Sequence, residues 1–192
     1  MTWKNDQVSR EETDKILAIA HENLGVDGDF VELGCYKGDT SLLLAEILVG
    51  TNKRLYIYDS FEGLPEKTEA DASVVGENFQ AGELFVSKRE VKERFLRANL
   101  PVPVIKKAWF NELSEADLPE QISFAFLDGD FYESIRDSLK SVSGRMVSGG
   151  KIIVHDYGTD ALPGVTKAVD EWLAKSAPTK TEKFQSLFII SF

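Results

Sequence analysis

Short apolar runs alternate along the chain with stretches in which apolar residues recur at helical spacing. The short runs are rich in β-branched and aromatic residues, as buried strands are. The predicted strands cover residues 29–34, 54–58, 102–105, 122–127 and 151–154, followed by a strand or strand pair over 183–192. The predicted helices cover residues 9–24, 42–50, 87–100, 135–144 and 163–172. This alternation predicts an α/β fold with a mostly parallel sheet and helices on both faces.

Local signals mark several element boundaries. Ser9 with Glu12, and Ser87 with Glu90, have the spacing of a capping box at a helix start. The glycine pair at 149–150 predicts a turn just before the strand that starts at residue 151.

The length of 192 residues is that of one domain with a core of its own. We therefore expect a single domain over 1–192, with an N-terminal helical segment over 1–27. Residues 60–86 are polar and have no clean period. Loops of this length in compact domains are usually functional, so the segment is predicted to be a lid or substrate loop, with a flexible insertion as the alternative.

Acidic residues end two of the predicted strands. Asp128 and Asp130 follow one strand, and His155 with Asp156 follows the next. The carboxyl ends of parallel strands form one edge of the sheet, where α/β folds bind ligands. Clustered carboxylates need a counter-charge or a raised pKa. Their oxygens suit Mg²⁺ or Mn²⁺, whereas an imidazole suits Mn²⁺, Fe²⁺ or Zn²⁺ better than Mg²⁺. A divalent metal site is one interpretation, and strand-end caps that face solvent are the other.

A glycine turn follows the first strand. Gly34 permits a close backbone approach, and the helix after Gly38 offers free amide donors. Glu32 and Asp59 end the first two strands, and an acid after the second strand is positioned to hold ribose hydroxyls. These features predict a nucleoside site, while the lack of a Gly-x-Gly pair weighs against NAD. The run Ala108-Trp109-Phe110 after the third strand is available to stack on a base, with packing in the core as the alternative for its aromatic residues.

Composition narrows the class of protein. The net charge of −10 weighs against nucleic acid, because affinity for phosphate backbones comes largely from Lys and Arg. No apolar run approaches the ~20 residues of a membrane span, and the N-terminal residues do not resemble a signal peptide. Cys35 is the single cysteine, so no internal disulfide forms. We expect a cytoplasmic protein with neither nucleic-acid nor membrane partners.

Four motifs together resemble the macrocin O-methyltransferase (TylF-like) family. They are VELGCYKGDTS at 31–41, YDSFEGLP at 58–65, LDGDFYES at 127–134 and GGKIIVHDY at 149–157. The resemblance runs in the family's order from about Asp29 to Trp172. It implies a Rossmann-like class I methyltransferase fold with a seven-stranded sheet. It also implies that S-adenosylmethionine and Mg²⁺ or Mn²⁺ are used to methylate a hydroxyl of a sugar or glycosylated metabolite.

The resemblance implies roles for individual residues. The expected cofactor-binding residues are Glu32, Gly34, Cys35, Tyr36, Gly38, Asp39, Thr40, Ser41, Asp59, Ser60, Ala108, Trp109 and Asp128. The turn would hold the methionine part, Asp59 the ribose, and Ala108-Trp109 would lie near the adenine. The expected metal ligands are Asp128, His155 and Asp156. Asp130 would be the general base that accepts the hydroxyl proton.

Two departures from the family leave alternatives open. The family usually has Asp-Asp-Tyr where this chain has His155-Asp156-Tyr157, which bears on the identity of the metal. Only one helix is predicted before the first strand, whereas sugar-modifying members carry more structure there, so another small hydroxylated metabolite is an alternative acceptor. The alternative functions are a catechol- or phenol-type O-methyltransferase and a non-catalytic S-adenosylmethionine-binding protein. A homodimer is expected by analogy alone.

Overall fold

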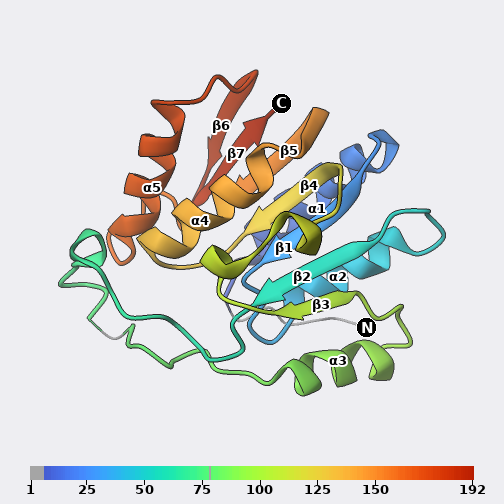
Figure 1. Ribbon diagram of the computed structural model, residues 1–192, viewed down its shortest axis with the longest axis horizontal. Coiled ribbons are helices and arrows are strands. Elements are labelled where there is room, and N and C mark those ends of the chain that lie inside the picture. The colour runs from blue at the N-terminus through green and yellow to red at the C-terminus, as the bar shows by residue number, and fades with distance from the viewer. Residues whose placement is uncertain (1–6, 78) are drawn as a thin grey trace.

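The structure is a computed structural model, and it describes residues 7–77 and 79–192. Its strands form a seven-stranded sheet in the order β3-β2-β1-β4-β5-β7-β6 (Figure 1). The strands are β1 (Asp29–Leu33), β2 (Leu55–Asp59), β3 (Val104–Lys107), β4 (Ile122–Leu127), β5 (Met146–Val154), β6 (Lys180–Phe184) and β7 (Leu187–Ser191). Strands β1 to β5 pair in parallel, and β7 pairs antiparallel with β5 and β6. The predicted α/β sheet is confirmed.

Helices cover both faces of the sheet (Figure 1). They are α1 (Arg10–Glu22), α2 (Asp39–Leu48), α3 (Lys88–Arg97), α4 (Tyr132–Ser143) and α5 (Pro163–Leu173). Side chains alternate along each strand, so β4 turns Phe124 and Phe126 toward α1, α2 and α3, and Ala125 and Leu127 toward α4 and α5. The same alternation puts Glu32 of β1 on the face of Phe30, which packs in the α1–α3 core.

Short one-turn helices complete the described elements. They are η1 (Asn23–Gly25), η2 (Glu69–Asp71), η3 (Phe110–Glu112) and η4 (Glu115–Asp117). The capping boxes of Ser9 with Glu12 and of Ser87 with Glu90 are both present, as predicted. None of the described helices is both long and apolar enough to cross a bilayer.

Two strand predictions need correction. The glycine pair at 149–150 forms no turn between elements, because β5 runs through it from Met146 to Val154. Gly149 adopts φ +82°, and its amide donates to the Phe192 carbonyl at 2.8 Å, so pairing continues through the distortion. Strand β3 starts at Val104, later than predicted, because Pro103 has no amide N–H to donate to a ladder.

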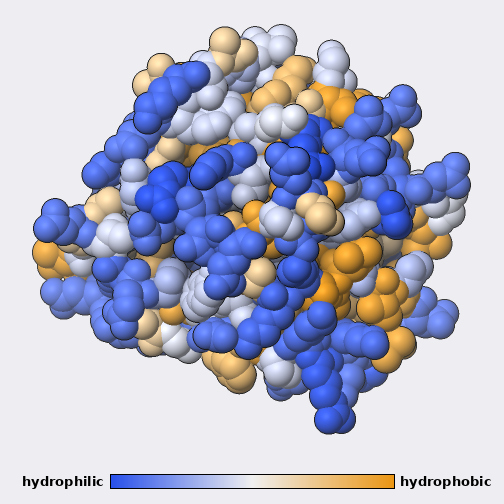
Figure 2. Space-filling view, in the orientation of Figure 1, coloured by the Kyte–Doolittle hydropathy of each residue, from blue (hydrophilic) through white to orange (hydrophobic). Residues whose placement is uncertain are grey.

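The surface facing the reader in Figure 1 is mostly hydrophilic over α4 and α5, and hydrophobic residues gather over β2, β3 and α3 (Figure 2). Leu96, Val102 and Val104 are among the exposed large apolar residues in that region. Residues 60–77 leave the end of β2 and pass along the ends of α4 and α5, and residues 79–86 lead back to α3 (Figure 1).

Candidate functional site

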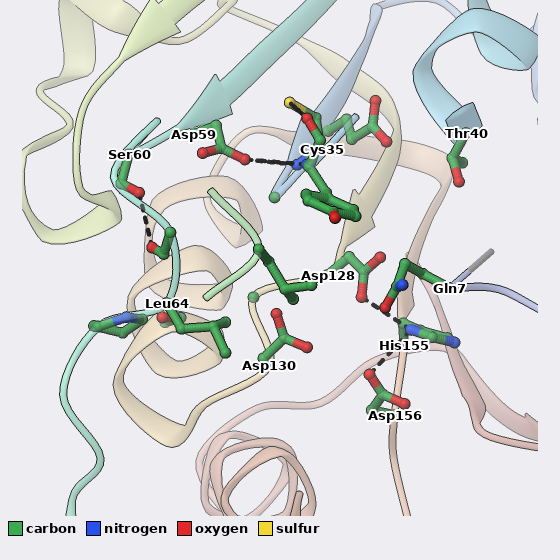
Figure 3. A pocket seen from close by; sticks show the side chains of 18 of the residues that line it. Gln7, Cys35, Thr40, Asp59, Ser60, Leu64, Asp128, Asp130, His155 and Asp156 are labelled. Carbon is green, nitrogen blue, oxygen red and sulfur yellow. Dashed lines mark hydrogen bonds and ion pairs between the residues drawn. The ribbon is translucent and has the colours of Figure 1, made fainter. Parts of the chain in front are cut away.

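The predicted ligand-binding residues meet at the carboxyl ends of β1, β2, β4 and β5. They line one pocket together with part of the 60–86 segment and the loop before α5 (Figure 3). The predicted residues in its wall are Glu32, Gly34, Cys35, Tyr36, Asp39, Thr40, Asp59, Ser60, Trp109, Asp128, Asp130, His155 and Asp156. The pocket lies where the strand order reverses between β1 and β4, which is the usual ligand site of an open α/β sheet.

Three residues expected to bind the cofactor lie outside this wall. Ser41 is fully buried in α2, and Gly38, with φ +80°, is the residue before that helix. The Ala108 amide donates to the Asp59 carbonyl at 3.0 Å. These residues belong to the glycine turn, to α2 and to the end of β3, next to the residues that line the pocket.

The glycine turn has no space for a side chain at Gly34. This residue adopts φ +88°, and a Cβ there would overlap the carbonyl group of Asp128. The Gly34 amide donates to the Tyr58 carbonyl at 2.9 Å, and the Asp128 amide donates to the Leu33 carbonyl at 2.9 Å. The ends of β1, β2 and β4 are therefore held against one another through backbone contacts.

Asp59 ties the end of β2 to the glycine turn. Its Oδ2 accepts hydrogen bonds from the amides of Cys35 at 2.9 Å and Tyr36 at 3.3 Å, and its Oδ1 accepts from Phe61 at 2.7 Å (Figure 3). The carboxylate thus holds two pocket loops in place. Its predicted role toward a ribose stays a prediction.

Glu32 is a nearly fully buried acid with 1% of its surface exposed. Its Oε2 has no hydrogen-bond partner among the described residues. The pKa of Glu32 is raised to about 8, mainly by burial and in addition by the charges of Asp128 and Asp59, while Ser41 offsets part of the rise. A buried, unpaired carboxylate oxygen in a pocket wall is suited to receive a cationic group of a ligand.

Asp128, His155 and Asp156 form one cluster. Nδ1 of His155 lies 2.9 Å from Asp128 Oδ1 and 3.1 Å from Asp156 Oδ2 (Figure 3). One ligand atom from each residue lies within 4.8 Å of the others. Adjacent ligands of an octahedral Mg²⁺ or Mn²⁺, at ~2.1 Å from the ion, are ~3 Å apart, so this donor set fits such an ion.

The same distances also allow a metal-free ion pair. Burial alone lowers the pKa of His155, but the carboxylates of Asp128 and Asp156 outweigh it and raise this pKa to about 11. An ion that binds Nδ1 must displace the proton there.

Asp130 projects into the pocket next to this cluster (Figure 3). Burial, followed by the charges of Asp128 and Asp156, raises the pKa of Asp130 well above its usual range. The surroundings therefore favour the protonated form of this carboxyl group, and its role as the general base stays a prediction.

Backbone strain is concentrated around the pocket. Tyr36, Phe61, Asp130 and Asp156 adopt positive φ values of 44°, 50°, 62° and 62°. Each left-handed non-glycine residue costs about 1–2 kcal/mol. Such conformations cluster at functional sites, where they aim particular side chains.

Sequence reasoning missed two parts of the site. Glu12 of α1 is buried, and its Oε2 lies 4.0 Å from His155 Nε2. Its Oε1 accepts from the Ser186 amide at 3.0 Å, a contact between distant residues that the capping-box spacing does not reveal. The apolar residues Leu64, Phe79, Leu84 and Leu162 of the pocket lining were also missed. Apolar residues inside the otherwise polar 60–86 segment were the available signal.

The sheet order and the antiparallel β7 define a Rossmann-like methyltransferase fold. The O-methyltransferase NovP has this fold, with a TM-score of 0.81 and 26% sequence identity, over 94% of this chain and 79% of NovP. The family model of macrocin O-methyltransferase (TylF) matches residues 10–182, and the chain belongs to that family. The calicheamicin methyltransferase CalS11 has the same fold at 17% identity, with a TM-score of 0.74, over 96% of this chain and 80% of CalS11.

Two characterised relatives are similar over part of their length. One is the 8-demethyl-8-(2,3-dimethoxy-alpha-L-rhamnosyl)-tetracenomycin-C 4'-O-methyltransferase of Streptomyces olivaceus, 33% identical over 71% of this chain. The other is the demethyldecarbamoylnovobiocin O-methyltransferase of Streptomyces niveus, 31% identical over 78% of this chain. The matches span 56% and 60% of these two relatives.

Proposed function

We propose that this protein is an S-adenosylmethionine-dependent O-methyltransferase that acts on a hydroxyl of a small molecule, with a sugar or glycosylated metabolite as the acceptor class. The observation that carries the proposal is the convergence of Glu32, Asp59 and Asp130 on one pocket in a chain of the TylF family. The acceptors printed in the names of the two relatives support the acceptor class.

The side of the pocket formed by β1 and β2 suits the cofactor. Glu32 presents an unpaired oxygen to the cationic amino group of the methionine part. Asp59 lies at the end of the second strand, where a carboxylate pairs with ribose hydroxyls, and Trp109 offers an aromatic face to the adenine. S-adenosylmethionine, when bound, supplies an electrophilic methyl group, and the sulfur keeps the bonding electron pair when that group leaves.

The side formed by β4 and β5 suits the acceptor. Asp128, His155 and Asp156 would hold a divalent ion, with Mn²⁺ favoured over Mg²⁺ by the nitrogen donor. Such an ion, when bound, supplies positive charge that lowers the pKa of a neighbouring hydroxyl. Asp130 takes the hydroxyl proton, and the strained backbone at this residue holds its carboxylate toward the pocket.

The net charge of −10 argues against a nucleic-acid substrate in this proposal as well. The homodimer stays a prediction.

The test is formation of S-adenosylhomocysteine from S-adenosylmethionine and Mn²⁺ with each of three acceptors. These are demethyldecarbamoylnovobiocin, methyl α-L-rhamnopyranoside and 3,4-dihydroxybenzoate. We expect turnover of at least one of the two sugar-bearing acceptors and its loss in Asp130→Asn. Turnover of the catechol alone would favour the phenol-type alternative. Cofactor binding without turnover of any acceptor would favour a non-catalytic binding protein.

A further inference from the structure

Asp71 is a buried acid that the proposed chemistry does not use. It belongs to η2, in the middle of the 60–86 segment, and only 2% of its surface is exposed. Its Oδ2 accepts from the Thr68 amide at 2.9 Å and the Thr68 hydroxyl at 2.7 Å. Its Oδ1 reaches across the molecule and accepts from the amide of Tyr132 at 2.7 Å. We call these contacts the Asp71 latch.

The latch supplies a cap that α4 lacks locally. Tyr132 is the first residue of α4, and the side chain of the preceding residue, Phe131, makes no capping hydrogen bond. The first amides of a helix have no partner within the helix and favour a negative charge. Asp71 meets this requirement from outside, at a point only two residues after Asp130.

The start of α5 encloses the same carboxylate. A Cβ on Gly164, the second residue of α5, would overlap Asp71 Oδ1 and would also press on Tyr132. The Asp71 carboxylate therefore sits between the beginnings of two helices. Each helix start has unpaired backbone amides that an oxygen acceptor can satisfy.

A second set of contacts fastens the segment to the loop after Asp156. The Ser73 hydroxyl donates to the Asp160 carbonyl at 2.5 Å and accepts from the Gly76 amide at 3.1 Å. A Cβ on Gly76 would overlap the carbonyl of Ala161, so the two chains are in close contact there. The segment is thus attached next to both strand ends that carry the acidic cluster.

The attached segment brings apolar side chains into the pocket. Leu64 and Phe79 flank the latch in sequence, and Leu84 follows; all three line the pocket together with Leu162 of the facing loop. We call these four residues the apolar wall. Leu64 and Asp130 both line this pocket (Figure 3). The wall and the acidic cluster thus belong to the same pocket.

We propose that Asp71 is a positioning residue that holds the apolar wall against the acceptor while Asp130 receives the hydroxyl proton. The inference rests on the proposed function, and it adds that the acceptor packs an apolar part of its skeleton on this wall. The hydrogen bonds of the latch involve neither Glu32 nor Asp59, so we expect its loss to leave the cofactor side of the pocket unchanged.

The test compares Asp71→Ala, Asp71→Asn and Gly164→Ala with Glu69→Ala, an exposed acid on the same short helix. Asp71→Asn keeps the acceptor for the Tyr132 amide and turns a donor toward Thr68. Gly164→Ala removes no contact group, and alanine is the better helix former, so only the overlap of its Cβ with the two latch partners, Asp71 and Tyr132, predicts a loss. The readouts are hydrogen exchange of peptides 64–80 and 129–135, calorimetric binding of S-adenosylhomocysteine, and KM for demethyldecarbamoylnovobiocin.

We expect both peptides to exchange roughly tenfold faster in Asp71→Ala and Gly164→Ala, with a smaller effect in Asp71→Asn and none in Glu69→Ala. We also expect KM to rise by a similar factor, with the exchange of residues 122–127 in β4 and the binding of S-adenosylhomocysteine unchanged. Unchanged exchange in the two peptides overturns the latch. Faster exchange with an unchanged KM overturns the positioning role. Exchange that rises equally in β4 shows a purely structural role and overturns it too. If the wild-type protein turns over none of the three acceptors, the proposed function fails. The hydrogen-exchange measurements still test whether the contacts of the Asp71 latch hold the segment in place.

Discussion

Glu32→Gln replaces a buried, unpaired carboxylate with a neutral group of nearly the same shape. The wild-type side chain has 1% of its surface exposed, and its pKa is raised from 4.5 to about 8, mainly by burial. The unfolded chain releases this proton near its ordinary pKa, whereas the folded protein keeps it up to about pH 8. Between these values the folded state binds more protons than the unfolded state, so the free energy of unfolding falls as pH rises.

The magnitude follows from the two pKa values. One pKa unit corresponds to about 1.4 kcal/mol, so the loss builds up from pH 4.5 and reaches at most about 5 kcal/mol at pH 8 and above. Glutamine does not titrate. The free energies of unfolding of wild type and Glu32→Gln should therefore be close at pH 5 and differ by several kcal/mol at pH 8, with the variant the more stable.

The assay is urea unfolding of both proteins at pH 5 and pH 8, with a chelator present and no cofactor. Glu46→Gln, an exposed glutamate on α2, is the matched control and should leave the pH dependence unchanged. At pH 8 and above, where Glu32 ionises, the same variant should weaken binding of S-adenosylmethionine roughly tenfold or more, because a charge-assisted contact is lost. Greater stability and weaker cofactor binding of the variant together would identify Glu32 as a ligand-binding residue whose burial destabilises the folded protein.

Parallel pH dependence in wild type and Glu32→Gln would refute the reasoning about burial. A more stable variant with unchanged cofactor affinity would leave the burial argument intact but contradict the contact with the cofactor.

Three further predictions address the rest of the pocket. Asp130→Asn should reduce kcat by at least about a hundredfold, because it removes the proton acceptor. The affinity for S-adenosylhomocysteine, measured by calorimetry, should stay unchanged. A kcat within tenfold of wild type would contradict this role. Wild type should gain melting temperature with Mn²⁺, and Asp156→Ala should lose this gain; an equal gain in the variant would place the ion elsewhere. Gly34→Ala should lower the free energy of unfolding, measured in urea, by about 2–4 kcal/mol, because a Cβ on this residue at φ +88° overlaps the Asp128 carbonyl. A decrease below about 1 kcal/mol would contradict the close approach of Gly34 to Asp128.

Sequence patterns predicted the sheet well where the signal was local. Strand β4 matches its prediction at 122–127 because an apolar run, interrupted only by Ser123, is bounded by polar residues on both sides. The two capping boxes placed the starts of α1 and α3. The glycine pair in β5 was misread because a left-handed glycine is compatible with a turn and also with a distortion inside a paired strand.

The candidate site divides in the same way. The ends of parallel strands lie at one edge, so the positions of Asp59, Asp128 and Asp156 could be predicted from strand order alone. The parts that were missed depend on contacts between distant residues. Asp71 and Glu12 each complete a local capping pattern, and that local role hides the second one, in which Asp71 reaches Tyr132 and Glu12 reaches Ser186.

Calorimetric titration of the protein with S-adenosylhomocysteine tests the central claim most directly, because every proposed role depends on a cofactor bound at the β1–β2 side of the pocket. We predict binding of one molecule per chain with micromolar affinity, weakened in Glu32→Gln and unchanged in Glu46→Gln. No heat of binding up to a ligand concentration of about 1 mM, where even weak specific complexes form, would contradict the account.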